Sequence, residues 1–283
     1  RIVANPPFVV GLPEVGHIYR DSGLNLDGAS ELVVSRAPEH LAPGGTAHLL
    51  AAWVHTHEQS WAARVASWLP KRGVAAWIIE RDVADPAHYV GTWLRDESID
   101  PRSAEAAART EAWLRHFDEH GVTGIGFGFV AIRDIGDEPS DIMAEPMPQA
   151  FTDPLGPEIE EYFDRIGWLR ERTATELADA TYLARPGLAR EDISQADTDA
   201  GVGFAPAALR LTRTDGPRWR HDVDKHLAAI VAGLHPHGLS LRETVGLYAL
   251  ANDLEEETLL DSAVPAVVDL VRHGLVLPAE VIL

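Results

Sequence analysis

The sequence predicts an α/β layered domain over residues 1–137, a linker over residues 138–157 and a mainly helical domain over residues 158–283. Short apolar runs typical of buried strands alternate with amphipathic stretches of helical period through the first part. Proline and glycine then become frequent among acidic and small residues, and they interrupt both periods. Beyond the linker the helical period dominates.

Strands and helices are expected to alternate in the first domain. Each expected strand is an apolar run too short for a helix, and each expected helix gathers apolar side chains on one face. The helix that contains Trp61 and Val65 ends at Lys71-Arg72-Gly73, where cations suit the helix dipole and glycine suits the cap. We expect the last two strands to lie antiparallel at an edge of the sheet. In chain order, the strands cover 2–4, 47–54, 74–79 and 125–132, and the helices cover 29–41, 61–69, 86–94 and 103–120.

The second domain combines helices with a few short strands. Apolar residues alternate over 207–214, and the turn dipeptide Asp215-Gly216 follows, so a small hairpin is predicted there. Helices that precede a short strand near the chain end indicate a winged-helix-like arrangement. The helical stretches cover 157–183 and 261–273, another helix opens at Ser240, and the last strand covers 274–277.

Composition narrows the class of protein. The chain of 283 residues is long enough for two cores. It holds 24 Lys and Arg against 44 Asp and Glu, and a net charge of −20 argues against non-specific nucleic-acid binding. With no cysteine, disulfides and thiolate sites are excluded. No apolar run approaches the length of a membrane helix, so we expect a cytoplasmic protein without membrane contact.

The strongest chemical signal is the motif Asn5-Pro6-Pro7-Phe8, directly after the first strand. Two prolines make a rigid turn and keep Asn5 out of helical space. The side-chain carbonyl of Asn5 and the backbone carbonyl of Pro6 can then accept the two hydrogens of one amine, while Phe8 stacks on the planar acceptor. Such hydrogen bonds favour a nucleophilic nitrogen by positioning and electrostatics. The alternative is an ordinary strand-end turn.

This motif resembles the Asn-Pro-Pro-aromatic motif of class I S-adenosylmethionine-dependent N-methyltransferases. Leu41-Ala42-Pro43-Gly44-Gly45 resembles the Leu-x-Pro-Gly-Gly turn that precedes the fifth strand of those enzymes. The resemblance covers about residues 1–135. It implies the back half of a Rossmann-like seven-stranded sheet, S-adenosylmethionine as cofactor and methyl transfer to an sp² nitrogen. The whole chain also resembles the C-terminal portion of larger actinobacterial methyltransferases.

The resemblance implies a glycine-rich cofactor loop after the first strand of the sheet, which is expected upstream of Arg1. An N-terminal part of the protein or another polypeptide would then supply it. The one Gly-x-Gly-x-Gly of the chain is Gly124-Ile125-Gly126-Phe127-Gly128. A cofactor loop leaves a strand and enters a helix, whereas an apolar strand continues after Gly128. We therefore interpret these glycines as close packing or a bulge inside a strand.

Substrate contacts are expected in the loop after the motif, at His17, Tyr19, Arg20 and Asp21. Arg20 and Asp21 can equally pair with each other on the surface. The methyl acceptor is a protein glutamine amide, a small molecule, or the exocyclic amine of adenine or guanine. The acidic charge favours a protein or small-molecule acceptor, and a nucleobase in a duplex would need to be flipped out.

Other residues are weaker candidates for metal or nucleic-acid binding, because each also has an ordinary structural explanation. His55-Thr56-His57-Glu58 and His235-Pro236-His237 lack an evident third metal ligand, so surface histidines are the preferred interpretation. Arg210, Arg213 and Trp219 belong to a basic, aromatic stretch that could contact single-stranded nucleic acid, but aspartates interleave it. The alternative to an enzyme is a catalytically inactive methyltransferase-like scaffold that acts as a protein-interaction module.

Overall fold

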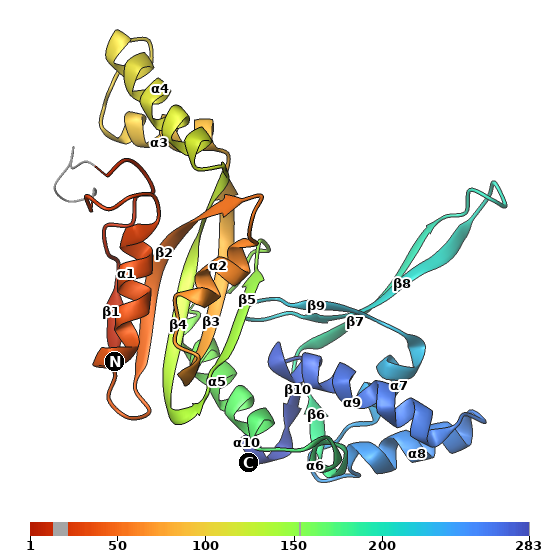
Figure 1. The fold of residues 1–283 in the computed structure, drawn as a ribbon. Helices are drawn as coiled ribbons and strands as arrows, with labels where there is room; N and C mark the ends of the chain where they lie inside the picture. The colour runs from red at the N-terminus through yellow and green to blue at the C-terminus, as the bar shows by residue number, and fades with distance from the viewer. Residues whose placement is uncertain (14–21, 153, 283) are drawn as a thin grey trace. The chain divides into compact units, whose positions relative to one another are not determined.

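A computed structural model describes residues 1–13, 22–152 and 154–282 of the chain (Figure 1). The chain forms two compact units, Arg1–Pro148 and Gln149–Leu283. Both contain helices and strands, so the mixed α/β class is confirmed. No helix in the described parts is long and apolar enough to cross a membrane.

The first unit is built on a five-stranded sheet with the order β1-β2-β4-β3-β5. Strand β4 runs antiparallel to both of its neighbours, while β1 pairs parallel with β2 and β5 pairs parallel with β3. The expected antiparallel pairing of the last two predicted strands is confirmed, but their placement at an edge is wrong, because β4 is internal and β5 forms that edge. The strands are β1 (Ile2–Ala4), β2 (Thr46–Thr56), β3 (Arg72–Ala84), β4 (Val122–Pro139) and β5 (Asp141–Pro146).

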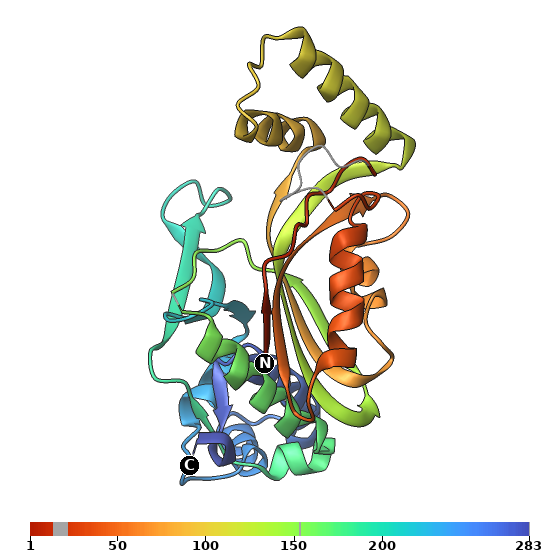
Figure 2. The same cartoon turned by 90° about the vertical axis from the view of Figure 1, so that its left-hand side faces the viewer.

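Helices cover this sheet in two groups with separate apolar clusters (Figures 1 and 2). Helices α1 and α2 contribute Val34, Val65 and Trp68 to one cluster, together with Trp53 of β2. Helices α3 and α4 form a hairpin between β3 and β4, and they contribute to the other cluster with Val54 of β2. The helices are α1 (Gly28–Arg36) with a 3-10 turn (Ala37–His40), α2 (Trp61–Ser67), α3 (Pro86–Asp96) and α4 (Ala104–Glu119).

The predicted linker over residues 138–157 needs correction. Its first half contains the end of β4 and all of β5, and the boundary between the units follows Pro148. Ile142 and Ala144 of β5 pack against the sheet core. The prolines misled the prediction because Pro139 and Pro146 lie at strand ends, where a missing N–H is tolerated.

The second unit contains six helices, a two-stranded sheet and a three-stranded sheet among its described residues. The stretch 157–183 is divided because Thr173 and Glu176 form a capping box that starts a new helix. Strand β10 pairs antiparallel with β6. The elements are α5 (Gly156–Arg170), α6 (Ala174–Asp179), β6 (Tyr182–Ala184), β7 (Leu188–Ala196), β8 (Phe204–Arg213), β9 (Arg220–Val223), α7 (Lys225–Gly233), α8 (Leu241–Ala251), α9 (Glu256–Arg272), β10 (Val276–Pro278) and α10 (Ala279–Ile282).

The predicted hairpin near Asp215 is confirmed as β8 and β9, but it belongs to a larger ribbon. Strand β7 pairs with β8 along its whole length, whereas β9 pairs only with residues 209–212 of β8. The outer part of the β7–β8 ribbon therefore extends beyond β9 (Figure 1). Sequence patterning missed β7 because most of its residues are polar and exposed, so it carries little apolar alternation.

Candidate functional site

The Asn5-Pro6-Pro7-Phe8 motif begins the loop that leaves β1, which we call the motif loop (residues 5–11). Strands β1, β2 and β3 run in the same direction, so their carboxyl ends meet at one edge of the sheet. The motif loop starts at that edge. Asn5 is exposed and makes no hydrogen bond to any residue that the structure describes.

Apolar contacts and one hydrogen bond hold the motif loop in place. The Phe8 ring packs on Phe127 of β4, with 5.4 Å between ring centroids. Val10 is completely buried, and its amide donates to the Tyr89 hydroxyl at 2.9 Å. A Cβ on Gly11 would lie 3.0 Å from the Trp113 ring, so that position needs a very small residue. The loop is thus fixed directly after its exposed asparagine.

Where the motif loop departs from the sheet, Ser30 of α1 and Asp27, the N-cap residue of this helix, take the place of β1 as hydrogen-bond partners of β2. Past Ala4, the β2 amides of Ala52 and Val54 donate to the Ser30 hydroxyl and the Asp27 carboxylate, both at 3.0 Å. Arg64 of α2 binds the same carboxylate through two nitrogens, at 2.6 and 2.7 Å. This hydrogen bond and the buried charge of Asp27 raise the pKa of Arg64. The arrangement lets β1 diverge without leaving backbone amides unpaired.

The α3–α4 hairpin lies beyond the carboxyl edge of the sheet (Figures 1 and 2). Its Tyr89 ring lies 6.4 Å from both Trp113 and Phe117, between centroids. His116 bonds Asn25, which lies just before α1, with 2.7 Å between Nε2 and Oδ1. Burial lowers the pKa of His116, and the charge of His120 adds to that effect. The hairpin therefore contacts the chain both within and after the motif loop.

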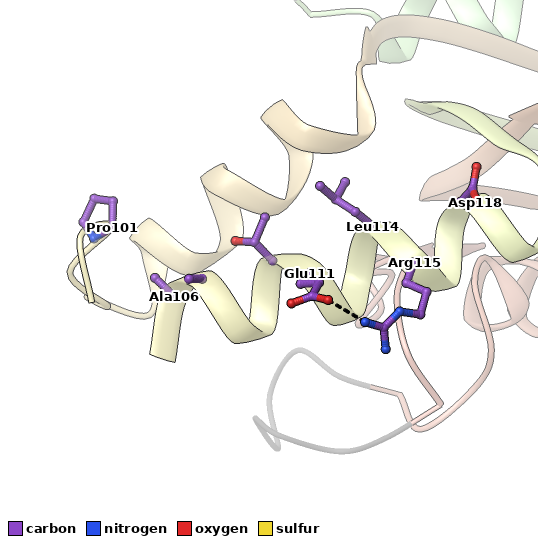
Figure 3. Close-up of a pocket in the computed structure, with 8 residues that line it drawn as sticks. Pro101, Ala106, Glu111, Leu114, Arg115 and Asp118 are labelled. Carbon is purple, nitrogen blue, oxygen red and sulfur yellow. Dashed lines mark hydrogen bonds and ion pairs between the residues drawn. The ribbon is translucent and has the colours of Figure 1, made fainter. Parts of the chain in front are cut away.

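An open hollow of about 640 Å³ lies along the exposed side of α4 (Figure 3). Pro101, Ala106 and Leu114 give it an apolar floor. Glu111 and Arg115 pair with each other at 2.6 Å on its rim. These two charges satisfy one another, which leaves Asp118 as the lining carboxylate without an ion pair to a described residue.

The glycines of 124–128 lie inside β4, as interpreted from the sequence. A Cβ on Gly126 would lie 2.2 Å from Trp53 Nε1 and 2.3 Å from a Glu80 carboxylate oxygen, and one on Gly128 would overlap the neighbouring strand. That Glu80 oxygen accepts from Trp53 Nε1 and bonds His55 Nε2, both at 2.7 Å. Gly126 thus makes room for a buried carboxylate. Sequence patterning missed Glu80 because it continues an otherwise apolar strand.

Several predicted residues make no site. His17, Tyr19, Arg20 and Asp21 lie outside the described residues. No group of three metal-ligating side chains occurs in the described ranges, and His55 is instead bonded to Glu80. The main residues of the hypothetical basic nucleic-acid surface in the second unit are also buried or paired. Trp219 is buried and stacks on His273, and Arg210 pairs with Asp222 at 2.7 Å.

Arg213, the other cation of that stretch, belongs to a buried ionic cluster that the sequence did not reveal. Glu158 is only 5% exposed, and it accepts from Arg213 Nη1 and from Arg165 Nη2, both at 2.9 Å. Burial by itself would raise the pKa of Glu158, but the two guanidinium groups outweigh it and hold this pKa below its ordinary value. The two arginines also donate to the carbonyls of Arg272 and His273, at the end of α9.

The cofactor implied by the resemblance was tested against the residues present. Its adenosine and carboxylate parts need a glycine-rich turn between a strand and a helix. Gly124, Gly126 and Gly128 do not provide that turn, because β4 continues to Pro139 and neighbouring atoms fill the space beside Gly126 and Gly128. No other Gly-x-Gly-x-Gly occurs in the sequence. The described residues thus do not fit the cofactor.

One family model matches the chain, within its second unit. The family described as a domain of unknown function (DUF7782) matches residues 160–278. The match runs from α5 to β10 and includes Arg165 and Arg213 of the buried ionic cluster. No curated protein matches the sequence.

Proposed function

We propose that the first unit is the acceptor-binding part of an S-adenosylmethionine-dependent methyltransferase that acts on an sp² amine nitrogen. Its sheet would be the back half of a Rossmann-like seven-stranded sheet. Asn5 and Pro6 hold the amine, Pro7 stiffens the turn and Phe8 stacks on the acceptor. The second unit serves as an accessory module, and the succession of α7, α8 and α9 before β10 supports its winged-helix-like description.

The observation that carries this proposal is the contrast between the exposed Asn5 and the fixed loop behind it. Asn5 has no hydrogen-bond partner among the described residues and precedes two prolines of fixed φ, so its amide is available to a ligand and little ordering is needed when the ligand binds. The position at the carboxyl edge of parallel strands supports it, because open α/β sheets bind ligands there.

The geometry supports a positioning mechanism. Two hydrogens of a planar amine donate to the Asn5 and Pro6 carbonyl oxygens, which oppose conjugation of the nitrogen lone pair and make the nitrogen more nucleophilic. Phe8 is half-buried against Phe127, so part of its ring stays open to the acceptor. These residues would hold only the acceptor, and S-adenosylmethionine, bound outside the described residues, would supply the methyl group from its sulfonium sulfur.

The acidic charge favours a glutamine side-chain amide or a small molecule over the exocyclic amine of adenine or guanine. A net charge of −20 repels phosphate groups. The pairing of Arg210 with Asp222 and the burial of Arg213 support the same choice, since they remove two cations from the nucleic-acid hypothesis.

The first test is calorimetric titration of S-adenosylhomocysteine into this chain and into the longest in-frame chain that contains it. Micromolar binding by the longer chain alone is expected, with the cofactor loop supplied by the added part. Binding by the present chain would require a cofactor site that we have not identified. If neither chain binds, the methyltransferase hypothesis is excluded and the alternative of an interaction scaffold is favoured.

Substitution of Asn5 tests the acceptor site in the cofactor-binding chain. Asn5→Ala should abolish methyl transfer and leave S-adenosylhomocysteine affinity within a few fold, because the side chain acts on the acceptor. Asn5→Asp keeps carboxyl oxygens as acceptors and should retain part of the turnover. Gln59→Ala alters another exposed amide and serves as the matched control. Unchanged turnover in Asn5→Ala would remove Asn5 from the mechanism.

A further inference from the structure

Helix α8 of the second unit has apolar residues on two opposite faces. Leu241, Val245 and Ala249 are buried in the unit. Leu247 and Leu250 lie on the opposite face, where their side chains are 58% and 82% exposed. A helix that is apolar around most of its circumference is normally buried. The second face of α8 is therefore apolar, like helix faces that are normally buried, although it is exposed here.

A third exposed leucine follows the end of the helix. The amide of Leu254 donates to the Ala249 carbonyl at 3.0 Å, in a turn that Asp253 enters with a positive φ of 55°. Leu254 is itself exposed. We call Leu247 and Leu250 the leucine ridge. Their spacing of three residues places both on one helical face, as in amphipathic helices that dock.

Carboxylates border the leucine ridge. Glu243 lies one helical turn before Leu247 on the same face. The Glu256 carboxylate lies against α8, because a Cβ on Gly246 would be 3.2 Å from it. Asp253, Glu256 and Glu257 are exposed, and none forms an ion pair with a residue that the structure describes.

The cation nearest in sequence does not offset this charge. Arg242 bonds Asp179 of α6 at 2.6 Å, so its charge is already matched. The surface around the ridge is thus apolar at its centre and negative at its rim, as in a docking site for a partner of opposite charge.

We propose that the leucine ridge docks an amphipathic helix of a partner protein that carries lysine or arginine beside its own apolar face. The partner's apolar residues pack on the leucines, and its cations meet Asp253, Glu256 and Glu257. A second copy of this chain would bring like charges together, and anionic lipid headgroups would be repelled in the same way. The charge around the ridge thus selects a basic helix.

The test uses the absence of cysteine in the chain. Ala251→Cys places a single thiol beside the ridge, and a fluorophore on it reports binding to the full chain. The probes are three synthetic 18-residue peptides. One is an amphipathic helix of leucine and lysine, the second has glutamate in place of lysine, and the third has the composition of the first with its leucines scattered around the helix. Micromolar binding of the first peptide alone is expected.

Variants locate that binding. Replacing both Leu247 and Leu250 by serine should weaken it about tenfold or more, because it removes the apolar area that the peptide would bury. Glu256→Gln should weaken it less and flatten its salt dependence. The matched control replaces Val202 and Phe204 by serine at the tip of the β7–β8 ribbon. These side chains are 79% and 77% exposed, and their loss should leave binding unchanged.

Four results would overturn the proposal. Equal binding of the scattered or the acidic peptide would show non-specific attraction. Equal binding by the double serine variant would place the site elsewhere. Self-association or binding to phosphatidylserine vesicles that this variant abolishes would identify another occupant. Finally, if Leu250→Cys reacts with Ellman's reagent more than about tenfold slower than Phe204→Cys, the ridge is already covered by the chain itself.

Discussion

The motif loop and the buried ionic cluster differ in the exposure and the hydrogen bonding of their polar groups. In the motif loop, Asn5 is exposed and bonds none of the residues that the structure describes, and Val9 and Val10 behind it are buried. In the ionic cluster, Glu158, Arg165 and Arg213 are almost completely buried and bonded to each other. Polar groups that are already satisfied stabilise a fold, whereas an unsatisfied group on a fixed backbone is available to a ligand. Exposure and pairing together therefore distinguish the candidate site from the buried ionic cluster.

The largest expected effect comes from removing the charge at the centre of the ionic cluster. Glu158→Gln removes the buried carboxylate that Arg165 and Arg213 share and leaves them only the more exposed Glu161 and Asp215, which should cost about 3 kcal/mol of unfolding free energy. Hydrogen-exchange mass spectrometry should show the loss in peptides of the second unit. Glu257→Gln, at an exposed carboxylate, is the control. Equal protection in both variants would contradict a structural role for the cluster.

The same cluster should make the second unit sensitive to acid. The pKa of Glu158 is lower in the folded protein than its ordinary value of 4.5, so its contribution is fully present above that pH. It is then lost as the pH falls below 4.5 toward the folded pKa. Urea denaturation between pH 7 and pH 3 should show this loss of unfolding free energy. Glu158→Gln should reduce the slope of the unfolding free energy against pH. An identical slope in the variant would assign the sensitivity to other carboxylates.

A further substitution tests the close packing of the glycines in β4. A Cβ on Gly128 would lie 1.8 Å from the Ile79 carbonyl oxygen, and backbone cannot move aside as a flexible side chain can. Gly128→Ala should therefore cost about 3 kcal/mol. Gly91 in α3 has open space around it, and Gly91→Ala should instead stabilise by about 0.5–1 kcal/mol. Similar unfolding midpoints for both variants would mean that Gly128 is not closely packed.

The smallest of these effects concerns the support of the motif loop. Tyr89→Phe keeps the aromatic ring but leaves the Val10 amide without its acceptor, which should cost about 1–3 kcal/mol locally. The Val10 amide should then exchange faster in NMR hydrogen exchange. Tyr248→Phe, which removes a hydroxyl bonded to His226, should leave Val10 unchanged. Unaltered exchange in Tyr89→Phe would show that the loop is not held at this point, and the contrast with the ionic cluster would fail.

The elements of the first unit could be largely predicted, because apolar periodicity is local. The strands of 47–54 and 125–132 appear as longer strands at the same places, and the helices of 61–69 and 103–120 appear as α2 and α4. The polar β7 and the proline-flanked β5 were missed because their pairing depends on neighbouring strands. Their own composition resembles that of loops.

The sequence by itself determined the α/β character of the first unit, the restricted backbone at Pro6 and Pro7 and the close packing of the glycines in β4. Each follows from local rules of period, proline geometry or side-chain size. Only the tertiary structure decided that Tyr89, Trp113 and Phe127 support the motif loop, that Glu80 binds His55, and that Arg213 is buried with Glu158. These residues are distant in sequence, and no local pattern specifies which partners long-range folding brings into contact.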